Sequence, residues 1–207
     1  MAIKITLQKT ERILFCSSKW WGDPDLPENM QYPTMEVNEG GESYEYPLTF
    51  ICQVNCEDLA AFDPEGKLPH EGMLYFFGAI DELIGYDSPV RTILGEWPKG
   101  RMVVKYAKNI NFETFQSSIL VDEDNQSLTE PELEMVFSVC EDNAPGIKML
   151  GCSTEADEET KDLVNLLQID EDSAAGFEAR GWDLLNVLIK ESDLKFGNWK
   201  KTRTFLF

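Results

Sequence analysis

The sequence has few basic side chains and a single histidine. Its 207 residues include 18 Lys or Arg against 38 Asp or Glu, which gives a formal net charge of -20 at pH 7. A field of this sign repels phosphate groups, so we expect the protein to bind neither nucleic acid nor an anionic membrane surface. The same field speeds encounter with basic proteins. The charge therefore favours solubility, and it permits a basic protein as the partner.

Long hydrophobic runs and paired cysteines are also missing. No apolar run reaches the roughly 18 residues of a membrane-spanning helix, and the first residues lack the apolar stretch of a signal peptide. The five cysteines are odd in number and include no Cys-x-x-Cys, so neither a disulfide framework nor a zinc site is indicated. Cys52 and Cys56 are close in sequence, but Cys52 lies in a predicted strand. We expect a reduced, cytoplasmic protein without a metal ion or cofactor.

The motifs of common enzymes are absent as well. The sequence contains no Gly-x-Ser-x-Gly, no Gly-x-Gly-x-x-Gly and no His-Glu-x-x-His. Gly95 and Gly100 have the spacing of a phosphate-binding loop, but Arg101 and Met102 follow where Lys and Ser or Thr are required. His70 lies in a predicted turn, the usual setting of an exposed histidine. These absences favour a binding protein over an enzyme, while the many carboxylates leave acid/base catalysis open.

Two stretches of the sequence resemble each other. Residues 48–55 and 163–170 are both apolar runs that end in Gln, an aliphatic residue and a short polar residue. After a polar loop, each is followed by a glycine that opens a second apolar run, at 72–77 and at 181–189. A strand-loop-strand unit of this kind can bury its apolar face against a copy of itself. The pattern therefore predicts an internal duplication.

Length and composition predict one domain. Hydrophobic residues make up 43% of the chain, which is enough for a sizeable core, and no linker-like segment interrupts the sequence. We expect a single compact domain over residues 1–207, with pseudo-repeat halves at roughly 1–100 and 101–207.

Apolar patterning predicts mostly β-strands. The Gly- and Pro-rich segment 20–41 is expected to be irregular, 56–62 to form one helical turn, and 154–166 to be helical before it enters a strand. Strands are expected at 3–7, 12–16, 48–54, 73–77, 88–94, 101–107, 166–169 and 202–207, with 88–94 and 101–107 as neighbours and the last strand docked within the same subunit. Residues 127–139 fit either a helix capped by Thr129 or a strand in their second half, and the alternating apolar residues favour the strand. The fold class is α+β, mainly antiparallel β-sheet with few short helices.

Polar residues at the ends of the repeated strands are the candidate site. Gln53 and Gln168 interrupt apolar strands at equivalent positions, and a buried amide without hydrogen bonds costs a few kcal/mol. Hydrogen bonds to an adjoining loop or to the twin unit would satisfy them. The other interpretation is that Gln53, Asn55, Gln168 and Asp170 converge at the junction of the halves and line a groove.

The motifs together resemble a known family. Residues 21–27 read Trp-Gly-Asp-Pro-Asp-Leu-Pro, 47–55 end in Gln-Val-Asn, and 68–77 read Leu-Pro-His-Glu-Gly-Met-Leu-Tyr-Phe-Phe. This ordered set resembles the YwqG-like family, a domain of unknown function called DUF1963, and residues 148–194 resemble its second half. The resemblance implies a mainly antiparallel α+β fold with internal duplication, and it implies no established activity, cofactor or catalytic residue. Trp21 stands where the family usually has glycine, and it joins the candidate binding residues.

Two classes of function fit the sequence. The first is a non-enzymatic, monomeric interaction protein, of the immunity or antitoxin type, directed against a basic protein partner. The alternative is an enzyme or small-molecule binder that uses a groove between the two halves.

Overall fold

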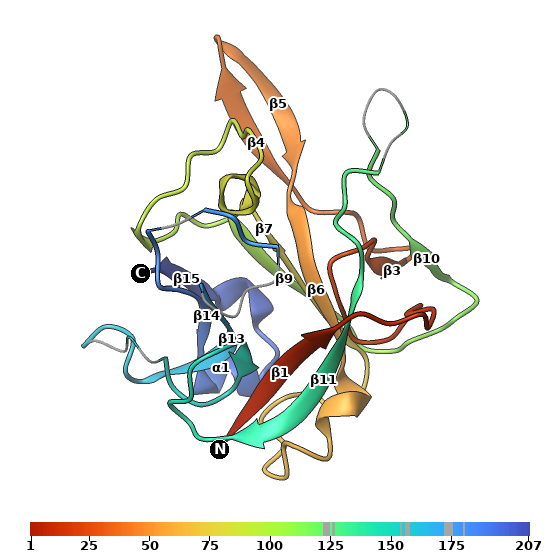
Figure 1. Cartoon of the computed structure of the whole chain (residues 1–207), viewed down its shortest axis with the longest axis vertical. Coiled ribbons are helices and arrows are strands. Elements are labelled where there is room, and N and C mark those ends of the chain that lie inside the picture. Colours follow the sequence, from red (N-terminus) through yellow and green to blue (C-terminus); the bar gives the residue numbers. More distant parts are fainter. Residues whose placement is uncertain (122–124, 126, 154, 156–157, 172–175, 180) are drawn as a thin grey trace.

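One large antiparallel sheet dominates the fold (Figure 1). A computed structural model describes the whole chain except residues 122–124, 126, 154, 156–157, 172–175 and 180. Within the described residues, eleven strands pair in the order β8-β15-β14-β13-β12-β1-β11-β2-β6-β7-β9. Their bounds are β1 (Ala2–Gln8), β2 (Lys19–Trp20), β6 (Thr49–Asn55), β7 (Met73–Gly78), β8 (Gly95–Glu96), β9 (Met102–Ala107), β11 (Leu133–Cys140), β12 (Lys148–Met149), β13 (Leu163–Asp170), β14 (Leu184–Lys190) and β15 (Arg203–Leu206). Strands from both predicted halves belong to this sheet, so the chain forms a single domain.

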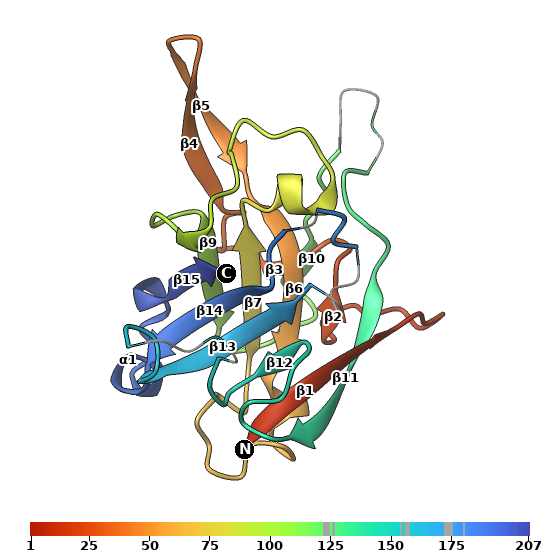
Figure 2. The same cartoon turned by 60° about the vertical axis from the view of Figure 1, so that its left-hand side comes forward.

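The sheet curls until its two ends approach each other (Figure 2). The short 3-10 helix η3 (Trp199–Lys201) precedes β15 near one end and packs against β9 at the other. The rings of Trp199 and Tyr106 have centroids 5.6 Å apart across this contact. The other helices are short: α1 (Glu191–Lys195), η1 (Cys56–Leu59) and η2 (Asp81–Ile84). In the described part of the chain, no helix is long and apolar enough to cross a membrane.

The continuous apolar runs of the sequence form strands that are buried on both faces of the sheet. Every residue of β7 is buried, and its side chains alternate between two hydrophobic clusters. Leu74 and Phe76 face the larger cluster, whereas Tyr75 and Phe77 face the smaller one. A strand covered on both faces reads as an unbroken hydrophobic segment, which explains why it was predictable from sequence. The predictions for β1, β6, β7, β9, β11, β13 and β15 and for the helical turn at η1 are confirmed.

The prediction that segment 20–41 is irregular is wrong in part. It contains β3 (Asp25–Pro27), which pairs with β10 (Phe115–Ser117), and β4 (Thr34–Glu39), which forms a hairpin with β5 (Glu42–Pro47). Gly40 and Gly41 form the hairpin turn with φ of 62° and 91°. Paired positive φ angles are the geometry of a tight β-hairpin turn, for which Gly-Gly is a sequence signal.

Two strand predictions are wrong because side-chain carboxylates accept hydrogen bonds from the backbone N–H groups of these segments. Residues 12–16 are irregular and end in a turn, in which Cys16 has φ of 54° and donates its N–H to the Asp25 carboxylate. Residues 88–94 are not a strand either, since Thr92 N–H donates to the Glu82 carboxylate. They therefore do not pair with β9, whose only described neighbour in the sheet is β7. Local hydrogen bonds from side chains compete in this way with sheet ladders.

The prediction of a helix at 154–166 is wrong for the described residues of this segment. Its first residue, Thr154, lies outside the described residues, as do 156 and 157. Residues 158–162 form turns, and Leu163 already begins β13.

Two strand pairs of the sheet have matching irregularities. The pairing of β6 with β7 shifts by one residue between Phe50 and Cys52, and that of β13 with β14 shifts between Asn165 and Leu167. In both strands the shift lies just before the glutamine singled out in the sequence.

The strands next to these pairs match as well. Lys19 of β2 lies opposite Gln53 of β6, and Lys148 of β12 lies opposite Gln168 of β13. Both lysines are buried. The Lys148 ammonium donates to the carbonyls of Asp142 and Cys152 at 2.7 and 3.0 Å, and burial lowers its pKa.

We predict that Gly72→Ala destabilises the protein far more than Gly66→Ala. Both glycines have positive φ, 80° and 61°, but a Cβ on Gly72 would lie 2.2 Å from the Ala107 carbonyl oxygen, whereas Gly66 has open space. The left-handed backbone alone costs an alanine roughly 1–2 kcal/mol. Urea unfolding should show a loss near this value for Gly66→Ala and about twice as much or more for Gly72→Ala. Equal losses would contradict the close packing of β7 against β9.

Candidate functional site

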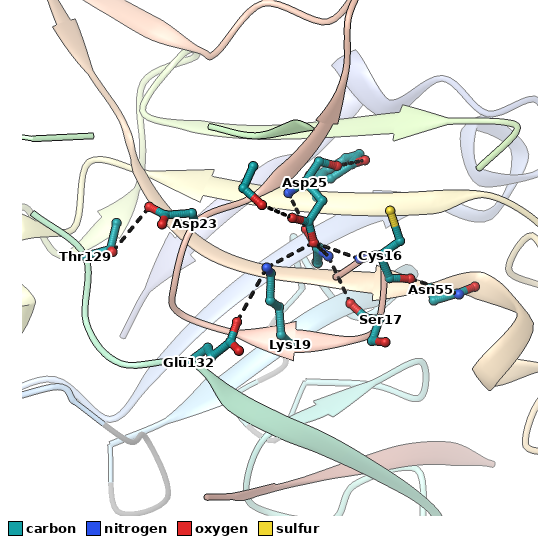
Figure 3. A network of polar contacts seen from close by, with 11 residues as sticks. Cys16, Ser17, Lys19, Asp23, Asp25, Asn55, Thr129 and Glu132 are labelled. Carbon is teal, nitrogen blue, oxygen red and sulfur yellow. Dashed lines mark hydrogen bonds and ion pairs between the residues drawn. The ribbon is translucent and has the colours of Figure 1, made fainter. Parts of the chain in front are cut away.

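A buried carboxylate, Asp25, organises the region that follows β2 (Figure 3). The Lys19 ammonium lies 3.0 Å from Asp25 Oδ2, and both side chains are almost completely inaccessible to solvent. The same carboxylate accepts hydrogen bonds from Cys16 N–H at 2.9 Å, from Gln53 Nε2 at 2.7 Å and from Ser117 Oγ at 2.6 Å. An ion pair removed from water is retained only when further hydrogen bonds satisfy it, as they do here.

The backbone of Asp25 is held as firmly as its side chain. Its N–H donates to Gln53 Oε1 at 2.8 Å, and its carbonyl accepts from the Tyr75 hydroxyl at 2.7 Å. Gln53 also donates to the Ser17 carbonyl at 2.9 Å. The Lys19 ammonium reaches a second carboxylate, Glu132 Oε2, at 3.6 Å. The network therefore joins β2, β3, β6, β7 and the entry to β11.

A pocket of about 460 Å³ lies beside this network. We call it the aromatic pocket, because four of its walls are the rings of Trp21, Tyr32, Tyr46 and Tyr86. Thr129 lines the pocket and donates to Asp23 Oδ1 at 3.4 Å. Burial raises the pKa of the Asp23 carboxyl.

Asp81, at the start of η2, lines the aromatic pocket and is 8% exposed. Its carboxylate accepts from the hydroxyls of Tyr46 at 3.0 Å, Ser88 at 3.3 Å and Thr49. Among the described residues, no lysine or arginine pairs with it. Burial, and next the charge of Asp81, raise the pKa of Tyr46 to about 12, so this hydroxyl stays protonated at neutral pH. The pocket thus contains a buried carboxylate whose hydrogen-bond donors, within the described residues, are all hydroxyl groups.

Further negative charge surrounds the pocket. Glu130 accepts from the Tyr86 hydroxyl at 2.7 Å, which raises the pKa of Tyr86. Tyr46 and Pro47 extend the pocket wall into the β4–β5 hairpin, which projects from the body of the molecule (Figure 1). That hairpin contains no basic residue and four glutamates: Glu36, Glu39, Glu42 and Glu45.

The candidate residues of the first repeat lie in and near the Asp25 network. Gln53 is fully buried and bonded as described. Asn55 is half-buried, caps η1 by accepting from Glu57 N–H at 3.1 Å, and donates to the Cys16 carbonyl at 3.3 Å. Trp21 packs between Trp20 and Phe177 and lines the aromatic pocket.

The candidate residues of the second repeat hold a different loop. Gln168 is fully buried and donates to the Gly146 carbonyl at 3.0 Å, and Asp170 accepts from Gly146 N–H at 3.2 Å. Gln53 and Asn55 bond instead to the segment between Cys16 and Asp25 and to Glu57. The structure therefore places the two pairs in separate local networks, each at its own strand end.

Sequence reasoning missed the charged residues of the site. Lys19 and Asp25 flank the Trp-Gly-Asp-Pro motif, so the motif was a signal for them. Asp81 carried no signal, because it is one of 38 acidic residues and its isolation arises from the tertiary fold. His70 lies 3.3 Å from Asp63 Oδ2, away from this network. Within the described residues, no group of three or more His, Cys, Asp or Glu side chains is arranged to hold a metal ion.

The fold and the pocket define a protein with one curled antiparallel sheet and a ligand-sized recess beside a buried ion pair. Residues 18–206 match the family model described as a domain of unknown function (DUF1963), and the chain belongs to this family. The match covers the Lys19–Asp25 ion pair and the aromatic pocket, and it confirms the resemblance inferred from the motifs. No curated protein matches the chain.

We predict that Lys19→Met lowers the free energy of unfolding by about 3–5 kcal/mol, because it leaves the buried Asp25 carboxylate without its counter-charge. The matched control is Lys161→Met, which breaks an exposed pair with Glu158 and should change stability by less than about 1 kcal/mol. Chemical denaturation measures both. A small effect at Lys19 would mean that the three neutral donors alone stabilise Asp25.

Proposed function

We propose that this chain is a non-enzymatic binding protein whose aromatic pocket receives a positively charged group of a basic protein partner. The observation that carries the proposal is Asp81, a buried carboxylate that lines the pocket and whose partners, among the described residues, are hydroxyl groups. Buried charges are normally paired, and an incoming ammonium or guanidinium would complete this one.

The aromatic walls suit the same ligand. A cation within about 6 Å of the face of Trp or Tyr is attracted by the ring quadrupole, more strongly where water is excluded. Trp21, Tyr32, Tyr46 and Tyr86 line the pocket. A pocket of about 460 Å³ accommodates the end of a lysine or arginine side chain together with part of its backbone.

The surroundings of the pocket support a protein as the partner. The acidic β4–β5 hairpin adjoins the pocket, and Leu128, on the pocket wall, is an exposed apolar side chain. An apolar contact beside a field of negative charge suits a basic protein surface, which the net charge of -20 would steer into place.

The proposal extends to the class of partner. An acidic protein without a recognisable catalytic constellation, acting in the cytoplasm as a monomer, fits the immunity or antitoxin type, in which binding covers a basic toxin. This extension rests on analogy with such proteins. In this proposal Trp21 contacts the partner directly. The other candidate residues have a structural role and fix the loops at the strand ends by hydrogen bonds: Gln53, Asn55, Gln168 and Asp170.

A second candidate function is an enzyme or small-molecule binder that uses a groove between the two halves. The observation that favours it is the recess formed where η3 meets β9, at the approaching ends of the sheet.

We also infer that the α+β fold arose by internal duplication. Trp21 and Gly22 have φ of 59° and 74°, and Leu150 and Gly151, at the matching places after Lys19 and Lys148, have 62° and 70°. Together with the matching strand shifts, these angles support two copies of one unit. The copies differ where the aromatic pocket lies, since Leu150 stands in the place of Trp21, which supports a binding role for the first copy alone.

The central strands support the same inference. β1, the first strand of one unit, pairs with β11 and β12 of the other unit. In the same way β11, the first strand of the second unit, pairs with β1 and β2 of the first. Lys4 lies opposite Lys148 just as Glu134 lies opposite Lys19. Thr6 and Val136 lie opposite each other at the centre of this arrangement, where a pseudo-twofold axis would pass.

We predict that Asp81→Asn weakens binding of a cation by about tenfold or more, because truncating one member of a buried charge pair costs about 2 kcal/mol or more. The probe is N-acetylarginine amide, titrated against NMR signals of Trp21 and Thr49 at constant ionic strength. The matched control is Glu57→Gln, which removes one exposed carboxylate from η1. Saturable changes in chemical shift should be seen in the wild type and in the control and should disappear in Asp81→Asn.

The partner itself is tested by affinity capture from a lysate of the native host at low salt, with the same three proteins as bait. A stoichiometric basic protein should be captured by wild type and Glu57→Gln, released as salt rises, and lost with Asp81→Asn. Equal capture by all three proteins would contradict a role for the aromatic pocket.

A further inference from the structure

A groove of opposite charge lies where the two ends of the sheet meet. It encloses about 1060 Å³ between the segment after β3, the last residues of β9 and the helix η3. Four lysines line it, Lys105, Lys108, Lys200 and Lys201, and we call it the lysine groove. Among its described lining residues there is no carboxylate, although the chain has 38 acidic residues against 18 basic ones. The sign of the charge inside this groove is therefore the reverse of that of the whole molecule.

The lysines of the groove are available for a ligand. Lys105 is half-buried on β9, donates to the Gln31 carbonyl, and has a pKa lowered by burial. In the described part of the chain, no carboxylate forms an ion pair with Lys105, Lys200 or Lys201. Lys108 lies 3.7 Å from Glu71 in an exposed pair, which is weak in water. A half-buried ammonium without a counter-charge favours an anion as its partner.

Aromatic and amide groups complete the lining. The half-exposed Trp199 ring packs at an interplanar angle of 49° against Tyr106, whose hydroxyl donates to the Glu71 carbonyl at 2.9 Å and is thereby fixed. The side-chain amides of Asn29 and Asn109 also line the groove. Flat rings stack on indole, and amides both donate and accept hydrogen bonds.

We infer that the lysine groove binds a small phosphorylated ligand that carries a flat ring, the chemistry of a nucleotide. The lysines would hold the phosphate groups, as lysine does in many phosphate sites, and Trp199 would stack on the ring. Inorganic phosphate alone would leave the aromatic side unused, and an uncharged ring alone would leave Lys105 without a counter-ion. The aromatic pocket has the opposite charge, so this inference stands independently of the basic partner, and it rests on the second candidate function, which uses the same recess.

The test is isothermal titration calorimetry of the full chain at low salt with three probes: adenosine triphosphate, tripolyphosphate and adenosine. Adenosine triphosphate should bind more tightly than either of the other two. The variant Lys200→Met with Lys201→Met changes only exposed residues, so it should fold normally and weaken binding by about tenfold or more. Trp199→Leu should reduce the affinity for adenosine triphosphate to that for tripolyphosphate.

The matched control is Lys4→Met with Lys9→Met, which removes two exposed charges on and just after β1 and should leave binding unchanged. Absence of saturable binding to the wild type would overturn the inference. So would tripolyphosphate that binds as tightly as adenosine triphosphate, or a control that loses as much affinity as the groove variant. Thermal unfolding of each variant, compared with wild type, separates loss of the groove from loss of the fold.

Discussion

The buried ion pair between Lys19 and Asp25 is the constraint on which the candidate sites depend. It ties the chain from residue 19 to residue 25 into a closed turn against Gln53, at 3.0 Å from ammonium to carboxylate. The clamped segment contributes Trp21 to the aromatic pocket, and Pro27, two residues after it, lines the lysine groove. A single polar network therefore positions a wall of each recess.

Each recess contains a buried or half-buried charged side chain, and the two side chains have opposite signs. Asp81 is a buried carboxylate without a basic partner in the described residues, and Lys105 is a half-buried ammonium without an acidic one. A fold gains no stability from holding isolated charges away from water, because each loses hydration that neutral hydrogen-bond donors or acceptors restore only in part. Such charges are typical of places where a ligand supplies the missing counter-charge.

Much of the sheet could be predicted from the sequence, because strands such as β7 are buried on both faces and read as apolar runs. The segments 12–16 and 88–94 could not, since the carboxylates of Asp25 and Glu82 take backbone amides that the pattern assigns to a ladder. For the site, the motifs at 21–27 and 47–55 indicated Trp21 and Gln53. Asp81 and Lys105 could not be found from the sequence, because what distinguishes them is that no described residue of opposite charge pairs with them, which only the tertiary structure reveals.

Amide hydrogen exchange tests most directly whether the Asp25 network belongs to the rigid core. The N–H of Cys16 donates to the Asp25 carboxylate, and the N–H of Asp25 donates to Gln53 Oε1, although neither bond is part of a sheet ladder. If the network fixes both recesses, these two amides should exchange only by global unfolding, as slowly as the amides of β7. Exchange at the rate of an exposed loop, while β7 stays protected, would contradict the claim that the ion pair positions the two sites.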